Sequence, residues 1–168
     1  MVRPVCISVS PAPRHSPRAL ACFASVAMTT LELLRQRAPG LAGMLDTFGN
    51  EELRRISSAI ARAVVDRAGL ADPLIDEALQ HLTFSAQLRP DLQARIQSLA
   101  EQLDSRYFDL QDLCERGRAT DIQVSSAFAK ARAATAVASA LGDVASTAAA
   151  DTAYEAVCGI VDSEDYFT

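Results

Sequence analysis

Few side chains in this sequence have the types and the spacing that catalysis or metal binding requires. Of the two histidines, His15 lies in a proline-rich N-terminal segment and only His81 falls on a predicted helix. Glu77 precedes His81 by four residues, and this spacing favours an ion pair on one helix face over a pair of metal ligands. The sequence has no phosphate-binding glycine motif, no HExxH motif and no GxSxG motif. We therefore predict no catalytic residues, no cofactor-binding residues and no metal site.

Carboxylates and thiols leave one enzymatic alternative open. Asp109, Asp112 and Glu115 recur every three residues along a predicted helix, which is the nearest approach in the sequence to a carboxylate metal site. The ExxH motifs that complete a di-iron helical bundle are absent. Cys114 and Cys158 have no local context that would lower a thiol pKa, so we expect reduced, mostly buried thiols. The alternative function is thus a small-ligand or metal-binding helical-bundle enzyme.

An aromatic residue among acids is the best candidate for a binding site. Residues 91–116 are predicted to form one long helix with a single apolar stripe, on which Cys114 lies and which Arg106 borders. Phe108 points about 160° away from Leu92 on this stripe, because each residue advances a helix by about 100°. An exposed aromatic side chain ringed by carboxylates suits a partly apolar, basic partner; the alternative is that Phe108 packs beneath another segment. The candidate partner-binding residues are Phe108, Glu101, Asp104, Asp112 and Glu115.

Capping and terminating residues divide the chain into the helices that position these side chains. Thr29 with Glu32, and Thr120 with Gln123, have the spacing of capping boxes, in which each side chain satisfies a free backbone N–H of the first turn. Gly69 suits the left-handed position that follows a helix. The expected helices cover residues 29 to about 39, 50–68, 73–84, 90–116, 120–141 and 143–161, with a short apolar turn at 41–48 and N-caps at Asn50, Asp72 and Asp143.

These elements predict an all-α fold. We expect five to six helices in an antiparallel helical bundle or a compact α-array, with residues 28–168 as a single domain. Alanines recur at helical spacing along 129–140 and 145–156. Small side chains let two helix backbones approach closely, so we expect an Ala-rich C-terminal hairpin that turns at Gly142.

Residues 1–27 read differently from the rest of the chain. Four prolines interrupt any helix there, and the first capping box follows directly after this segment. We expect a disordered or mis-assigned N-terminal extension, with Met28 as the alternative start, and a cytoplasmic protein. The other interpretation is export, because residues 19–27 form a short apolar run like that of a signal peptide. No segment has the length and apolarity of a membrane span.

The distribution of charge bears on the kind of partner. The formal net charge is −5, and all 21 acidic residues lie after residue 27. An acidic body disfavours a sequence-independent grip on nucleic acid and favours a partner with a basic surface. Residues 61–80 have the outline of a helix-turn-helix, which gives a DNA-binding regulator as a third function. Its second helix, however, presents Asp72, Asp76 and Glu77 and no Arg or Lys.

Three stretches, residues 103–113, 127–136 and 151–156, together resemble small, uncharacterised all-α proteins of high-GC bacteria. The resemblance implies a helical fold and such a source, and it implies no activity. Size, charge and helicity therefore lead to the first hypothesis: a non-enzymatic, acidic helical module that binds another protein, as accessory, antitoxin or immunity proteins do by analogy.

Overall fold

The computed structural model describes residues 28–85 and 87–164 of the chain. The described part is all-helical, as predicted, and it contains no strand. The predicted count of five to six helices is wrong, because this part of the chain forms seven. The helices are α1 (Thr30–Arg37), α2 (Pro39–Leu45), α3 (Asn50–Ala68), α4 (Pro73–Phe84), α5 (Pro90–Glu115), α6 (Asp121–Ala140) and α7 (Ala145–Glu164).

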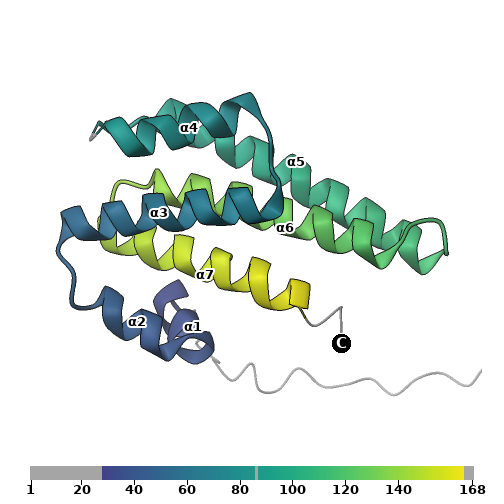
Figure 1. Cartoon of the computed structure of the whole chain (residues 1–168), viewed down its shortest axis with the longest axis horizontal. Coiled ribbons are helices and arrows are strands. Elements are labelled where there is room, and N and C mark those ends of the chain that lie inside the picture. Colours follow the sequence, from purple (N-terminus) through teal and green to yellow (C-terminus); the bar gives the residue numbers. More distant parts are fainter. Residues whose placement is uncertain (1–27, 86, 165–168) are drawn as a thin grey trace, which may run out of the picture.

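Helices α3, α6 and α7 pack against one another in the middle of the molecule (Figure 1). Helix α5 lies along α6, and α4 contacts α3, α5 and α6 on the same side. Helices α1 and α2 cover α7 on the opposite side. The far ends of α5 and α6 extend past all the other helices in this view. Of the seven described helices, only α6 therefore accompanies α5 along its second half.

The additional helix is α2, which lies where the sequence indicated an apolar turn. Pro39 is the first residue of α2, a position that tolerates proline because its N–H would have no partner within the helix. Gly40 and Gly43 are both helical, and no side chain or backbone atom would meet a Cβ at either position. Ala42 and Leu45 are buried against α7. Tertiary burial therefore outweighs the poor helix propensity of the glycines.

Local capping signals locate most helix ends. The capping boxes of Thr29 and Thr120 are present, and the Asp72 carboxylate accepts a hydrogen bond from the backbone N–H of Leu74 at 2.8 Å. Gly69 has φ +60°, as expected for the left-handed residue after a helix. Two predicted caps are wrong by one residue. The N-cap of α3 is Gly49, and Asn50 is the first helical residue. In α7 the backbone oxygen of Val144, rather than that of Asp143, accepts the first hydrogen bond.

The core divides into two clusters around the Ala-rich helices. One joins α3, α4, α5, α6 and, through Ala156, α7, and its large side chains include Ile75, Leu92, Ile96 and Val137. The other joins α1, α2, α3 and α7 around Leu34. The predicted hairpin of small residues is confirmed, because the Thr152 hydroxyl on α7 lies 3.4 Å from the backbone oxygen of Ala136 on α6. Its buried alanines include Ala133, Ala136, Ala140, Ala145, Ala149, Ala153 and Ala156.

The expectations for residues 1–27 lie outside the described residues. None of the helices in the described part is long and apolar enough to cross a membrane.

Candidate functional site

The far half of the α5–α6 hairpin, residues 101–130, projects as a two-helix arm. The buried residues of α5 are Leu92, Ile96 and Ala100, which all lie in its first half. Within the arm only Val124 is buried, and continuous burial on α6 begins at Ala131. Two helices alone cannot enclose a core, because each must bury an apolar stripe against more than one neighbour. The arm is therefore held in place by the bundle at its base, and no other described helix covers it along its length.

The apolar residues inside the arm are only half-buried. The Tyr107 ring packs against the Phe128 ring of α6 with ring centroids 5.2 Å apart. It also contacts the neighbouring Phe108 ring at 5.0 Å. Leu103 and Leu110 of the predicted stripe, and Leu113 beside it, are neither buried nor fully exposed. The apolar residues therefore do share one face of α5, as predicted. Within the arm, α6 is the one described helix that covers this face.

Phe108 projects from one face of the arm. Its side chain is 60 % exposed, so it does not pack beneath another described segment. Glu101, Asp112 and Glu115 are exposed on the same face of α5. Asp104 differs, because it is half-buried and forms an ion pair with Arg132 of α6. The structure therefore brings together Phe108 and three of the four predicted acids, and it assigns the fourth to a contact between helices.

Arg132 joins three helices at the base of the arm. It donates to Asp104 on α5 and, through Nη1, to Glu155 Oε2 on α7 at 2.9 Å. Its guanidinium also lies over the Phe128 ring, 5.5 Å from the ring centroid. A Cβ added to Gly159 would lie 3.2 Å from Arg132 Cβ, so α7 approaches this arginine closely at the glycine. These contacts fix the angle at which the arm leaves the bundle.

Burial and charge shift the ionisation of this network. Burial raises the pKa of Glu155 above its ordinary value, and the charge and hydrogen bond of Arg132 do not fully offset this effect. For Arg132, burial lowers the pKa, but the hydrogen bond to Asp104 and the charges of Glu155 and Asp104 outweigh burial and raise it. The arginine therefore remains a cation under all ordinary conditions.

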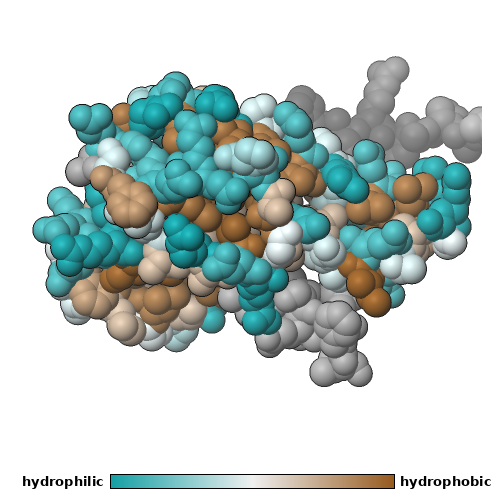
Figure 2. Space-filling view, turned by 45° about the horizontal axis from the view of Figure 1, so that its top comes forward, coloured by the Kyte–Doolittle hydropathy of each residue, from teal (hydrophilic) through white to brown (hydrophobic). Residues whose placement is uncertain are grey.

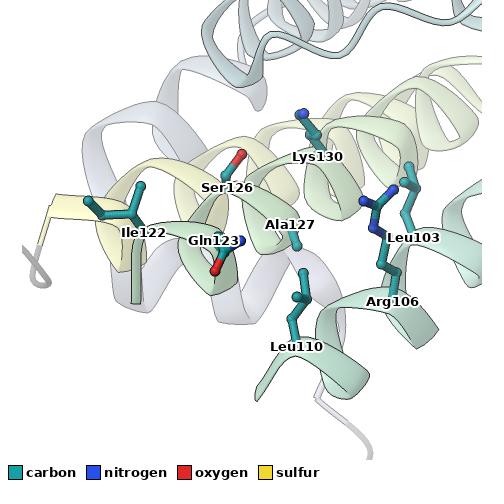
Figure 3. Close-up of a pocket in the computed structure, with 8 residues that line it drawn as sticks. All are labelled: Leu103, Arg106, Leu110, Ile122, Gln123, Ser126, Ala127 and Lys130. Carbon is teal, nitrogen blue, oxygen red and sulfur yellow. The ribbon is translucent and has the colours of Figure 1, made fainter. Parts of the chain in front are cut away.

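The other face of the arm carries a groove between α5 and α6 (Figure 3). Its volume is about 330 Å³. Arg106 and Lys130 lie toward the base of the arm, and Ile122 lies toward the tip. Ile122 is 67 % exposed, which is unusual for a large aliphatic side chain. The groove is lined by Leu103, Arg106, Leu110, Ile122, Gln123, Ser126, Ala127 and Lys130.

The sequence-based reasoning did not find this groove, although it contained two signals. Arg106 borders an apolar stripe, where a charged side chain requires a reason. Lys130 is the only lysine of the chain. Neither residue indicates a groove alone, since the site forms only when the packing of α5 against α6 makes both residues line the same groove.

The two cysteines of the described residues differ in burial. Cys114 is half-buried rather than buried, and its Sγ donates to Asp121 Oδ1 at 3.2 Å. This hydrogen bond, followed by burial and by the charges of Asp121 and Glu115, raises the pKa of the Cys114 thiol. Cys158 is buried, as predicted. The predicted burial of Cys114 was wrong because the apolar stripe of α5 extends farther than the described helices that cover its first half.

The predicted pair of Glu77 and His81 is also replaced by other contacts. Glu77 lies near Arg89 at 3.6 Å and Arg95 at 3.5 Å, and His81 Nε2 lies 2.6 Å from the backbone oxygen of Gln87. Asp109, Asp112 and Glu115 do not converge on a common point. Among the described residues, no group of three or more His, Cys, Asp or Glu side chains is placed to hold a metal ion.

Comparison with known proteins adds no functional assignment. The resemblance to helical proteins of high-GC bacteria stays a prediction. No family model, no curated protein and no solved structure matches this chain.

Proposed function

We propose that this protein is a non-enzymatic helical module that binds another protein through its α5–α6 arm. The observation that carries the proposal is the uncovered arm itself. A helix of 26 residues has buried residues only in its first half, and among the described helices only α6 runs beside its second half. A chain gains little stability from extending two helices into solvent, so a partner that covers them is the physical reason for the extension.

The surface of the arm has the composition of a binding site. Phe108 and Ile122 are both more than half exposed on different faces of the arm. Figure 2 shows one side of the molecule, on which hydrophobic residues reach the surface in several places, including the arm at the right. Large aromatic and aliphatic side chains with charged neighbours are typical of the residues that dominate binding energies. These groups project from helices that are already formed, which lowers the entropy cost of binding relative to an unfolded segment.

For the Phe108 face we propose a protein partner with a basic surface. Glu101, Asp112 and Glu115 remain exposed on this face. Opposite charges around an apolar contact increase the association rate and exclude wrong partners. Asp104 takes no direct part in this proposal, because it is already paired with Arg132.

The experiment compares how much partner is recovered by variants of the arm and by a control variant at the end of α4. Full-length protein, immobilised and exposed to lysate of its native host, should recover a partner that mass spectrometry identifies. Phe108→Ala and the double change Glu101→Lys with Asp112→Lys should each reduce recovery at least about tenfold, the equivalent of about 1.4 kcal/mol. Phe84→Ala is a matched control, because Phe84 is 85 % exposed and lies outside the arm.

Two results would contradict the proposal. Equal recovery by wild type and the arm variants would remove the Phe108 face from the interface. Loss of recovery on Phe84→Ala alone would move the interface to the end of α4.

A further inference from the structure

The groove and the Phe108 face are separate surfaces of the same arm. Arg106 and Phe108 are two positions apart on α5, so their side chains leave the helix about 200° apart. Phe108 does not line the groove, and none of the eight residues that line it is acidic. The groove therefore has a different charge from the Phe108 face, and the two surfaces suit different chemistry.

The cations of the groove are without a counter-charge in the described part of the chain. Arg106 and Lys130 form no ion pair and no side-chain hydrogen bond with a described residue. Other arginines of this acidic protein are paired, for example Arg35 with Asp46 at 2.9 Å. Both cations border a groove whose lining holds no acid, so the carboxylates of a bound partner would supply the counter-charge that the groove itself lacks.

Apart from the two cations, the groove between the two helices is lined by four apolar residues and by the polar Gln123 and Ser126. Leu103 and Leu110 come from α5, and Ile122 and Ala127 come from α6. A third helix laid in this groove would cover the leucine stripe that the arm leaves half-buried, as an amphipathic helix does in a helix-in-groove complex. The apolar residues of the groove would bind the apolar face of such a helix. The two cations would favour acidic residues along the edge of that face.

We propose that the groove binds an acidic amphipathic helix of another protein, with its apolar face on Leu103, Leu110 and Ile122 and its carboxylates on Arg106 and Lys130. A second copy of this chain is the less favoured occupant. Pairing the groove with itself around a two-fold axis would bring Arg106 and Lys130 close to their own equivalents. The proposal deepens the proposed function because it assigns a second partner chemistry to the same arm.

The test uses two synthetic peptides that differ only in charge. Each has about 18 residues, or five helical turns, with leucines on one face and a fluorescent label. In one peptide glutamates flank the leucines. In the other peptide lysines take the place of these glutamates, and the leucines are unchanged. Fluorescence anisotropy with the full-length protein should show that the acidic peptide binds at least about tenfold more tightly than the basic one. This preference should shrink as salt is added, because salt screens exposed charges.

Variants of the groove make the test specific. Arg106→Glu with Lys130→Glu should reverse the preference between the peptides, whereas Arg106→Lys with Lys130→Arg should retain it. Arg62→Glu with Arg55→Glu is the matched control, because it makes the same change in net charge at exposed positions on α3. Circular dichroism of each variant checks that the helices are retained, and the reversal itself shows a folded groove.

Three outcomes would overturn the inference. The first is equal binding of both peptides or of neither. The second is that the α3 control variant loses binding of the acidic peptide to the same extent as the groove variant does. The third is a concentration-dependent dimer of the wild type, seen by analytical ultracentrifugation, that Arg106→Glu with Lys130→Glu abolishes; the occupant would then be a second copy. Phe108→Ala should leave peptide binding unchanged, so failure here is distinct from failure at the Phe108 face.

Discussion

Arg132 and Glu155 lie at the junction between the arm and the bundle, with Arg132 Nη1 2.9 Å from Glu155 Oε2. The pair connects α6 to α7, and the second hydrogen bond of Arg132, to Asp104, extends the connection to α5. The two side chains are 21 % and 15 % exposed, so water weakens this pair less than the exposed pairs of the molecule. The orientation of the arm therefore depends on one arginine and two carboxylates.

Replacing Glu155 with glutamine should change how stability depends on pH. The pKa of Glu155 is raised by burial, so the folded protein holds this proton more tightly than the unfolded chain does. The contribution of such a group to stability is greatest below its ordinary pKa of 4.5 and falls as the pH rises through the folded pKa. Relative to wild type, Glu155→Gln should become progressively more stable from about pH 4.5 toward neutrality. Urea unfolding at a series of pH values measures this difference.

The exposed Glu101 provides the control, since Glu101→Gln on the arm surface lies outside the Arg132 network. A difference between Glu155→Gln and wild type that is independent of pH, or that grows in the opposite direction, would show that Glu155 is not penalised by burial.

Truncating Phe108 should leave the fold nearly as stable as it is. Its ring is 60 % exposed and contacts mainly Tyr107, so we expect Phe108→Ala to cost about 1 kcal/mol or less. Ile96→Ala, in the covered half of the same helix, should cost about 2–5 kcal/mol because Ile96 is fully buried. Thermal or urea unfolding compares the two. A loss of several kcal/mol for Phe108→Ala would place the ring in a core and remove it from any binding face.

The Cys114 thiol should react slowly although it is partly accessible. Its hydrogen bond to Asp121, together with burial and the nearby acidic charges, raises its pKa and thereby depletes the reactive thiolate. Asp121→Asn should accelerate alkylation of Cys114 severalfold near neutral pH, whereas Asp112→Asn should change it little. Mass spectrometry of the peptides that contain each cysteine separates Cys114 from the other thiols. An unchanged rate in Asp121→Asn would mean that burial alone controls this thiol.

Local sequence signals predicted the helix ends far better than the neighbours of each helix. Thr29, Asp72 and Thr120 determine their helix starts through hydrogen bonds within four residues, so the sequence is sufficient there. The start of α2 was missed because Pro39 and Gly40 indicate the end of one helix as well as the start of the next. Only the burial of Leu45 in the cluster that α2 shares with α1, α3 and α7 decides between these interpretations.

The candidate site shows the same division between local and tertiary information. Helical periodicity placed Phe108 opposite the apolar stripe, and the structure finds it exposed. Periodicity identifies which residues share a face but not where the covering helices stop. Cys114 was therefore expected in a core that does not reach it, and Asp104 was expected in solvent although Arg132 approaches from α6. The groove depends on α5 and α6 together and has no signature on either helix alone.

Hydrogen exchange of the full-length protein, followed by mass spectrometry, tests the central claim that the arm is less well packed than the bundle and offers its surface to a partner. Backbone amides of residues 104–114 and 122–130 should exchange through local opening, well before those of residues 92–100 and 131–140, because only the latter lie in a covered core. Equal protection along the whole length of α5 and α6 would contradict the account, since it would mean that the far half of the hairpin is as well packed as the bundle and needs no partner to cover it.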